Sequence, residues 1–303
     1  PYNEIYLATW GLAAGRSDRF QFRQAHGVRG RRAGRGVNAI ARDQAGPLPQ
    51  QRLRCSDGVS VAWYDWPGAS PLPPVILQHG FAADVQLNWL APGIVDALRA
   101  RGRRVIAIDA RGHGNSDVPR DAAAYGEPRM ALDLRELADA LQLGAFDLFG
   151  YSMGAVVAAL VAGADRRVRR LILGGVGEGM VVSGGVDLRV MQRDRLVSAL
   201  CADSTDAIAD AEVLAFRSFA ERAGADLQAL ALQARRMHDV PQDFTSIAVP
   251  TLVLAGAGDE LASNPERLAQ AFSNGQLRRV AGNHLGAVRE PEFAIAAVDF
   301  LCQ

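Results

Sequence analysis

Hydrophobic residues fall into two alternating patterns from about residue 50 onward. Short runs rich in Val, Ile, Leu and aromatic residues end in glycine, aspartate or histidine, which is typical of buried β-strands. These runs are QRLRC, VSVAWYDW, PVILQHG, RVIAIDARG, FDLFG, RRLILGG, TLVLAGAGD and LRRVAGNH. Between most of them, apolar residues recur at helical spacing, and this spacing predicts helices over residues 89–101, 130–143, 155–164, 265–272 and 291–301.

This alternation of strands and helices indicates the fold class. Strands that are apolar throughout are buried on both faces, and the connecting helices supply that cover. The pattern therefore predicts an α/β protein built on a parallel, doubly wound sheet. Ligands of such sheets bind beyond the carboxyl ends of the strands, so the polar residues that end the strands are the first candidates for a functional site.

Composition narrows the function classes. The chain has 303 residues, a hydrophobic content of 49% and a formal net charge of zero, so it can bury a large core. A neutral chain has no global field that would favour nucleic acid, an anionic membrane or an acidic substrate. We expect a small, uncharged molecule as the partner, with no nucleic acid and no membrane, and the sequence leaves a homo-oligomer open.

The cysteines and the apolar runs bear on metals and on location. Cys55, Cys201 and Cys302 are widely spaced and do not have metal-ligand spacing, so we expect no metal site and a reduced environment. No apolar run approaches the ~18 residues of a membrane helix, and the N-terminus lacks the compact apolar region of a secretory signal. These features predict a cytoplasmic protein.

An arginine-rich segment precedes the alternating pattern. Residues 11–45 carry arginines and glycines without sustained periodicity. They predict a disordered extension over residues 1–47, with no assigned role, followed by one folded domain over residues 48–303. A nucleic-acid or membrane tether is the alternative for this segment, and the scarcity of interleaved aromatic residues disfavours it.

The sequence GYSMG, residues 150–154, follows the apolar run FDLFG and precedes a run of small residues. Glycines two positions before and two positions after Ser152 allow a strand to turn sharply into a helix, which leaves the serine strained and its hydroxyl exposed. The first N–H groups of that helix point into the same space and can stabilise an oxyanion. Ser152 is therefore the candidate nucleophile.

A serine nucleophile needs a base that is itself oriented by a third group. His284, which follows the last predicted strand, is the candidate base, and Asp259, which follows the strand before it, is the candidate acid. Glu178, after the sixth predicted strand, is an alternative acid. We favour Asp259 because Glu178 lies among glycines where the chain is expected to bend.

Two backbone N–H groups are expected to form the oxyanion hole. One belongs to Met153, directly after the candidate nucleophile, and the other to Phe81, in the loop after PVILQHG. His79 is expected to shape this loop rather than to react. The segment DARGHGNSD, residues 109–117, is expected to fix a turn beside the site.

Together, LQHGF, DARGHGNSD, LFGYSMGA, PTLVLAGAGDE and AGNHLGAVREPEFAIAAVDFL resemble the α/β-hydrolase superfamily and cover about residues 50–303. Their order and spacing are similar to the serine-nucleophile branch that contains haloperoxidase-like esterases and meta-cleavage-product hydrolases. The resemblance implies a mostly parallel eight-stranded sheet, a triad of Ser152, His284 and Asp259, no cofactor, and a helical cap inserted after strand 6. One departure is Ala155, where many relatives have a second glycine; it leaves the triad intact.

The cap candidate is the segment over residues 179–246, because it has few strand signals and carries apolar residues at helical spacing. Five of its side chains either line an apolar pocket or belong to plain core: Met180, Met191, Phe216, Phe219 and Met237.

The sequence thus predicts a cofactor-independent serine hydrolase that acts through an acyl-enzyme. The expected scissile bond is a carboxylic ester, or a related acyl or carbon–carbon bond next to a carbonyl, in a small and largely apolar substrate. An acyltransferase with the same triad is one alternative. A non-catalytic ligand-binding protein on this fold is the other, although such a protein would usually have lost a member of the triad.

Overall fold

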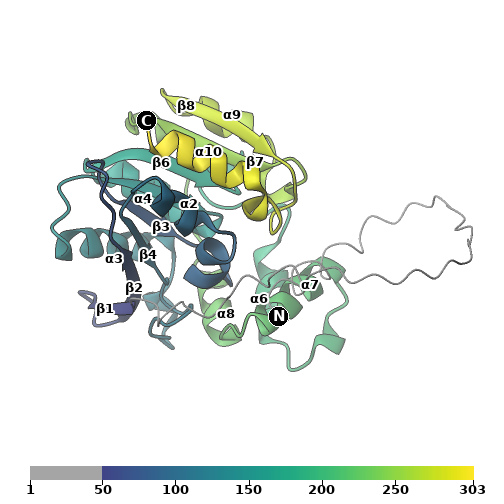
Figure 1. The fold of residues 1–303 in the computed structure, drawn as a ribbon. Helices are drawn as coiled ribbons and strands as arrows, with labels where there is room; N and C mark the ends of the chain where they lie inside the picture. The colour runs from purple at the N-terminus through teal and green to yellow at the C-terminus, as the bar shows by residue number, and fades with distance from the viewer. Residues whose placement is uncertain (1–49) are drawn as a thin grey trace, which may run out of the picture.

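One eight-stranded sheet organises residues 50–303, the part of the chain that the computed structural model describes (Figure 1). In sheet order the strands run β1-β2-β4-β3-β5-β6-β7-β8. β2 pairs antiparallel with β1 and β4, and the pairs from β4 to β8 are parallel. The strands are β1 (Gln50–Arg54), β2 (Ser60–Trp66), β3 (Val75–Gln78), β4 (Val105–Ile108), β5 (Phe146–Tyr151), β6 (Val168–Gly174), β7 (Thr251–Gly256) and β8 (Gly275–Val280). The expected mostly parallel, eight-stranded sheet is confirmed, whereas the expected extension over residues 1–47 lies outside the described residues.

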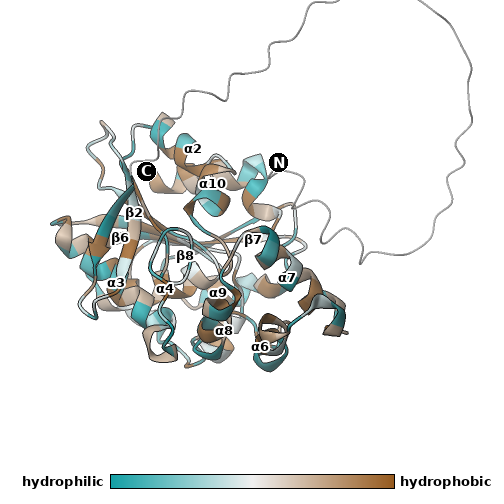
Figure 2. Ribbon diagram, turned by 90° about the horizontal axis from the view of Figure 1, so that it is seen from below, coloured by the Kyte–Doolittle hydropathy of each residue, from teal (hydrophilic) through white to brown (hydrophobic). Residues whose placement is uncertain are grey.

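Helices cover both faces of the sheet, as a doubly wound arrangement requires. α2 (Ile94–Ala100) and α10 (Pro291–Leu301) lie on one face, and α3 (Glu127–Ala140), α4 (Met153–Ala164) and α9 (Pro265–Gln270) lie on the other (Figure 2). Side chains of β3 alternate accordingly: Val75 and Leu77 pack with α2 and α10, and Ile76 packs with α3 and α4. Among the described residues, no helix has both the length and the apolar character that a bilayer span requires.

The connection from β6 to β7 is long and helical. It contains α5 (Gly179–Ser183), α6 (Arg193–Cys201), α7 (Ala211–Arg222) and α8 (Leu227–Arg235), with short 3₁₀ turns η3 (Thr205–Ala207) and η4 (Phe244–Ser246). α6, α7 and α8 gather beside the sheet in Figure 1 and share a buried apolar cluster of their own. This cluster reaches the rest of the molecule at Phe81, Ala82 and Leu285, all in loops that follow strands.

Shorter elements complete the chain. Within residues 50–303, three 3₁₀ turns lie outside the β6–β7 connection, namely η2 (Ala122–Ala124), η5 (Glu260–Ala262) and η6 (Ala287–Arg289). The helix predicted over residues 89–101 is in fact two pieces, the π-helical turn η1 (Gln86–Leu90) and α2. Gly93 separates the two, because its φ of 79° lies in the left-handed region. The helix predicted from residue 130 begins earlier, at Glu127, with a proline in its first turn.

A buried ion pair links three distant parts of the fold. The Arg103 guanidinium donates to Asp147 Oδ2 at 2.6 Å, to the Pro73 carbonyl at 2.6 Å and to the Leu301 carbonyl. Both charged side chains are fully inaccessible to solvent. Burial raises the pKa of Asp147 above its ordinary value, although Arg103 acts in the opposite direction. The pair therefore depends on both partners, since either charge alone would be buried without compensation.

The substitution Arg103→Met is expected to lower the free energy of unfolding by about 3–5 kcal/mol, because it leaves the Asp147 carboxylate buried and unpaired. Urea unfolding measures this loss, and adding Asp147→Leu should restore much of it. Arg104→Met is the matched control: Arg104 pairs with Asp65 but keeps 34% of its side chain exposed, so its loss should stay within about 1 kcal/mol. Equal losses at positions 103 and 104 would contradict this account.

Candidate active site

The turn between β5 and α4 places Ser152 in a strained conformation. Its φ of 53° and ψ of −118° are rare for a residue with a side chain. The two flanking glycines make the turn feasible: a Cβ on Gly150 would lie 2.0 Å from the Gly154 carbonyl oxygen, and a Cβ on Gly154 would lie 2.0 Å from the Gln78 carbonyl oxygen. The spacing of GYSMG therefore reflects close backbone contact on both sides of the serine.

Side chains from three strand ends meet at this turn. His284 Nε2 lies 3.0 Å from Ser152 Oγ. On the other side of the ring, His284 Nδ1 lies 2.9 Å and 3.0 Å from the two carboxylate oxygens of Asp259. A carboxylate can only accept a hydrogen bond, so Nδ1 carries the ring proton and Nε2 is left to accept from the serine hydroxyl. The structure thus brings the predicted serine, histidine and aspartate together.

Local hydrogen bonds hold the acid and the base in place. The Asp259 side chain is fully buried, and its Oδ1 accepts from the backbone N–H groups of Leu261 and Ala262 at 3.0 Å and 3.2 Å. The Tyr151 hydroxyl donates to the His284 carbonyl oxygen at 2.5 Å. These contacts shape the loop after β7 and tie the loop after β8, which carries His284, to the end of β5, so the position of the imidazole does not depend on its contacts with Ser152 and Asp259 alone.

Glu178, the alternative acid, has other partners. Its carboxylate accepts from Arg189 at 2.8 Å, Asn264 at 3.1 Å and Arg267 at 3.2 Å. The Arg189 guanidinium, followed by Arg267 and Asn264, holds the pKa of Glu178 below its ordinary value. Within the described structure, the carboxylate that hydrogen-bonds to His284 is that of Asp259.

Backbone donors lie beside the serine. Met153 is the first residue of α4, so its N–H is one of the groups that an α-helix leaves unpaired. Neither this N–H nor that of Phe81 has a hydrogen-bond partner among the described residues. Both residues line the same cavity as Ser152. Their N–H groups are therefore available to an oxygen atom bound there.

A cavity of about 570 Å³ opens over Ser152 and His284. Most of its wall is apolar, and much of it comes from the β6–β7 connection. Four of the five predicted pocket side chains line it, namely Met191, Phe216, Phe219 and Met237. The fifth, Met180, is instead buried in the core on the α3 and α4 face. No set of three or more metal-ligating side chains clusters anywhere in residues 50–303.

The segment DARGHGNSD forms the turn after β4 and is held by its own side chains. Asp109 accepts from the Tyr64 hydroxyl, the Val85 N–H and the Asn115 N–H, each at 2.9 Å. The Asp109 carboxylate fills the space beside Gly114, where a Cβ would lie 2.3 Å from it. One carboxylate therefore joins the loops that follow β3 and β4.

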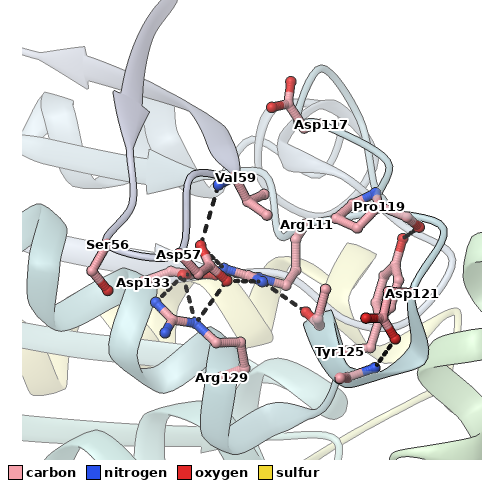
Figure 3. A network of polar contacts seen from close by, with 12 residues as sticks. Ser56, Asp57, Val59, Arg111, Asp117, Pro119, Asp121, Tyr125, Arg129 and Asp133 are labelled. Carbon is pink, nitrogen blue, oxygen red and sulfur yellow. Dashed lines mark hydrogen bonds and ion pairs between the residues drawn. The ribbon is translucent and has the colours of Figure 1, made fainter.

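Arg111, which belongs to the same turn, is held by a network of polar contacts (Figure 3). Its buried guanidinium bonds to both oxygens of Asp133 at 2.6 Å and 2.7 Å, to Asp57 at 2.8 Å and to the Ala124 carbonyl at 2.7 Å. Arg129 approaches the same two carboxylates. None of the members of this network lines the cavity over Ser152.

Two further histidines shape the loops without approaching Ser152. His79 uses both ring nitrogens: Nε2 accepts from the Ala110 N–H at 2.9 Å, and Nδ1 faces the Gly80 carbonyl at 2.8 Å. The His113 ring packs against Phe81, with ring centroids 6.0 Å apart. Burial, together with nearby His79, lowers the pKa of His113 to about 3, so it is neutral at physiological pH. His79 therefore shapes the loop as expected.

Comparison with known proteins agrees with the fold. Residues 73–199 match the family model described as alpha/beta hydrolase fold. The chain is 28% identical over 255 residues to a non-heme chloroperoxidase of Streptomyces lividans, covering 75% of this chain and 90% of that one. It is 27% identical to a solved hydrolase from Pseudomonas aeruginosa, with a TM-score of 0.67 over 83% of this chain and 98% of that one.

A shorter match has a different name. Over 145 residues, the chain is 36% identical to the dihydrolipoyllysine-residue acetyltransferase component of the acetoin cleaving system of Pseudomonas putida. The match covers 47% of this chain and 37% of that protein. For three of the curated relatives, this one included, the chain spans about half of the relative's length or less.

The turn geometry leads to a paired test within one helix. Gly154→Ala is expected to lower the free energy of unfolding by about 1–3 kcal/mol, because its new methyl group meets the Gln78 carbonyl and must displace backbone. Gly163→Ala, also in α4, should raise it by about 0.5–1 kcal/mol, since the nearest atom to its methyl group lies 4.0 Å away and alanine favours helix. Chemical denaturation compares the two, and a Gly154→Ala protein as stable as Gly163→Ala would show that the contact is not tight.

Proposed function

The chain belongs to the α/β-hydrolase superfamily, and from that premise we propose that it is a cofactor-independent serine hydrolase acting through an acyl-enzyme. The observation that carries the proposal is the unbroken line of hydrogen bonds from Asp259 through His284 to Ser152, at 2.9 Å and 3.0 Å. Such a line activates a hydroxyl that is otherwise a weak nucleophile. The proposed substrate is a carboxylic ester, or a related acyl or carbon–carbon bond next to a carbonyl.

In the first half of the proposed reaction, Ser152 Oγ attacks the carbonyl carbon while His284 Nε2 takes its proton. The imidazolium then gives this proton to the leaving alcohol as the carbon–oxygen bond breaks, which leaves the acyl group on Ser152. In the second half, water attacks the acyl-enzyme with the same nitrogen as base. The proton returns from the imidazolium to Ser152, and the acid product departs.

Each supporting group has a distinct part in this proposal. Asp259 keeps the imidazole in the tautomer that can accept from the serine and stabilises the imidazolium that forms. The N–H groups of Phe81 and Met153 receive the negative charge that develops on the carbonyl oxygen. Their lack of other partners in the described structure supports this role.

The β6–β7 connection is the proposed source of substrate selection. Residues 179–246 would act as a helical cap, since α6 and α7 supply Leu196, Phe216 and Phe219 to the wall of the cavity. A cavity of about 570 Å³ with this lining suits a small, largely apolar acyl or alcohol group.

An acyltransferase is the second candidate, favoured by the similarity to the acetyltransferase component from Pseudomonas putida. The first half of the reaction would be unchanged, and an alcohol or thiol would replace water in the second. Product analysis with added acceptors separates the two candidates, because hydrolysis leaves the acyl group as the free acid, whereas transfer leaves it on the added acceptor.

A fluorophosphonate probe is expected to label Ser152, because the reagent reacts with an activated serine hydroxyl beside oxyanion donors. Intact-protein mass spectrometry should show one addition, which Ser152→Ala abolishes. Ser116→Ala is the matched control, since Ser116 is also buried but donates to the Asp109 carbonyl oxygen. Labelling that survives Ser152→Ala would rule out this nucleophile.

Loss of the orienting acid should be severe. Asp259→Asn is expected to lower kcat by on the order of 10⁴-fold, as in the serine proteases, because it favours the wrong tautomer of His284. Glu178→Gln should leave kcat within about threefold, since Glu178 bonds to arginines rather than to the histidine. Both values come from initial rates on 4-nitrophenyl esters of graded acyl length. A normal Asp259→Asn enzyme with an inactive Glu178→Gln enzyme would mean that the acid is misassigned.

A further inference from the structure

Asn88 is a buried polar residue at the catalytic cavity that sequence reasoning did not single out. It lies in the η1 turn, only 6% of its surface is accessible, and it forms part of the cavity wall. Its Oδ1 accepts from the Gly80 N–H at 2.8 Å. The side chain is therefore hydrogen-bonded to the loop that also carries the Phe81 N–H.

This hydrogen bond fixes which way the carboxamide faces. Only the amide oxygen can accept from an N–H, so the amide nitrogen must be the other terminal atom. Among the described residues, that nitrogen makes no hydrogen bond, and it is not sealed away from solvent either. Asn88 is one of the residues that line the cavity, so its two N–H donors are available to a group bound there.

Asn88 and Ser152 are close neighbours across Gly80. The point that a Cβ would occupy on Gly80 lies 3.3 Å from Ser152 Cβ and 3.5 Å from Asn88 Oδ1. The carboxamide is thus on the same side of the cavity as the serine and next to the oxyanion loop. In the free protein, water can satisfy this donor, and a bound oxygen that accepts from it would take the place of that water.

We propose that Asn88 is a further catalytic residue, whose carboxamide N–H donates to an oxygen of the reacting ester as negative charge develops. This inference rests on the proposed serine hydrolase function. The ligand class is an ester or other acyl compound with a carbonyl oxygen, and the tetrahedral intermediate is the species that the third donor stabilises. The same side chain orients the oxyanion loop through its oxygen, so its two ends act on one reaction.

Two substitutions separate the donor from the loop anchor. Asn88→Asp keeps an oxygen for the Gly80 N–H and removes the donor, whereas Asn88→Ala removes both. Gln86→Ala is the matched control, because Gln86 is an exposed residue of the same η1 turn. The measurements are kcat and KM for 4-nitrophenyl butyrate, the inhibition constant of butane boronic acid as a tetrahedral mimic, and the thermal unfolding midpoint.

Asn88→Asp is expected to unfold near the wild-type temperature yet lose at least about 100-fold in kcat, the usual effect of removing one oxyanion donor. KM should change little, and the boronic acid should bind more weakly by a similar factor. Asn88→Ala should also lose kcat and boronic acid affinity, and Gln86→Ala should match the wild type in both. Wild-type kcat and boronic acid affinity in Asn88→Asp would overturn the proposal and leave Asn88 as a loop anchor only.

The wild-type chain distinguishes this failure from failure of the proposed function. If fluorophosphonate labels Ser152 and the ester is hydrolysed, normal Asn88 variants refute only the third donor. If the wild type neither reacts with the probe nor hydrolyses the ester, the serine hydrolase function is refuted and the donor role falls with it. A loss of kcat in both Asn88 variants with unchanged boronic acid affinity would also overturn the proposal, since a donor to the tetrahedral species must affect both.

Discussion

The close approach of two backbones, one after β3 and one after β5, governs the geometry of the whole site. The Gly154 position has no room for a side chain against the Gln78 carbonyl, and Gly80 lies against the Tyr151 carbonyl and Ser152. Interiors packed to this density shift as units rather than atom by atom. The strained serine and the loop that carries the Phe81 N–H are therefore held at a fixed separation, which is what preorganised donors require.

Buried polar side chains extend this constraint outward. Asp109 joins the loops after β3 and β4 through Val85, and His79 joins them again through Ala110. Arg111 then ties the second loop to Asp133 on α3. Burying such polar groups costs free energy, but each of them is hydrogen-bonded, which offsets this cost. The hydrogen bonds also hold the loops in one arrangement. Polar contacts as well as packing therefore hold the loops of the site against the sheet.

Local signals in the sequence predicted the strands and the residues that end them. GYSMG carries a recognisable glycine spacing, although the crowding behind it is local only at Gly150, which meets the Gly154 carbonyl, whereas Gly154 meets the Gln78 carbonyl of β3. The division of residues 89–101 was missed, because the buried Ile94 and Leu98 recur at helical spacing and the helix was extended back to the buried Trp89. The Pro92–Gly93 pair is the sequence signal for this break, and the left-handed φ of Gly93 separates the two pieces.

Long-range contacts account for what the sequence could not distinguish. Glu178 and Asp259 both follow strands, and the difference between them is their partners, since Arg189 and Arg267 engage one and His284 engages the other. Asn88 gave no signal, because it precedes the helix predicted over residues 89–101 and no catalytic motif surrounds it. Its contact with Gly80 exists only once η1 folds back over the loop.

The separate apolar cluster of α6, α7 and α8 has a consequence for how such a protein can diversify. Side chains such as Phe219 and Met237 shape the chamber, whereas Ser152, Asp259 and His284 lie directly after strands of the sheet. Under the proposed function, selection of the substrate and reaction with it are thus encoded on different stretches of the chain. Substitutions that reshape the chamber can accumulate without disturbing the reactive groups, so an evolving lineage can explore new ligands on an inherited chemical apparatus.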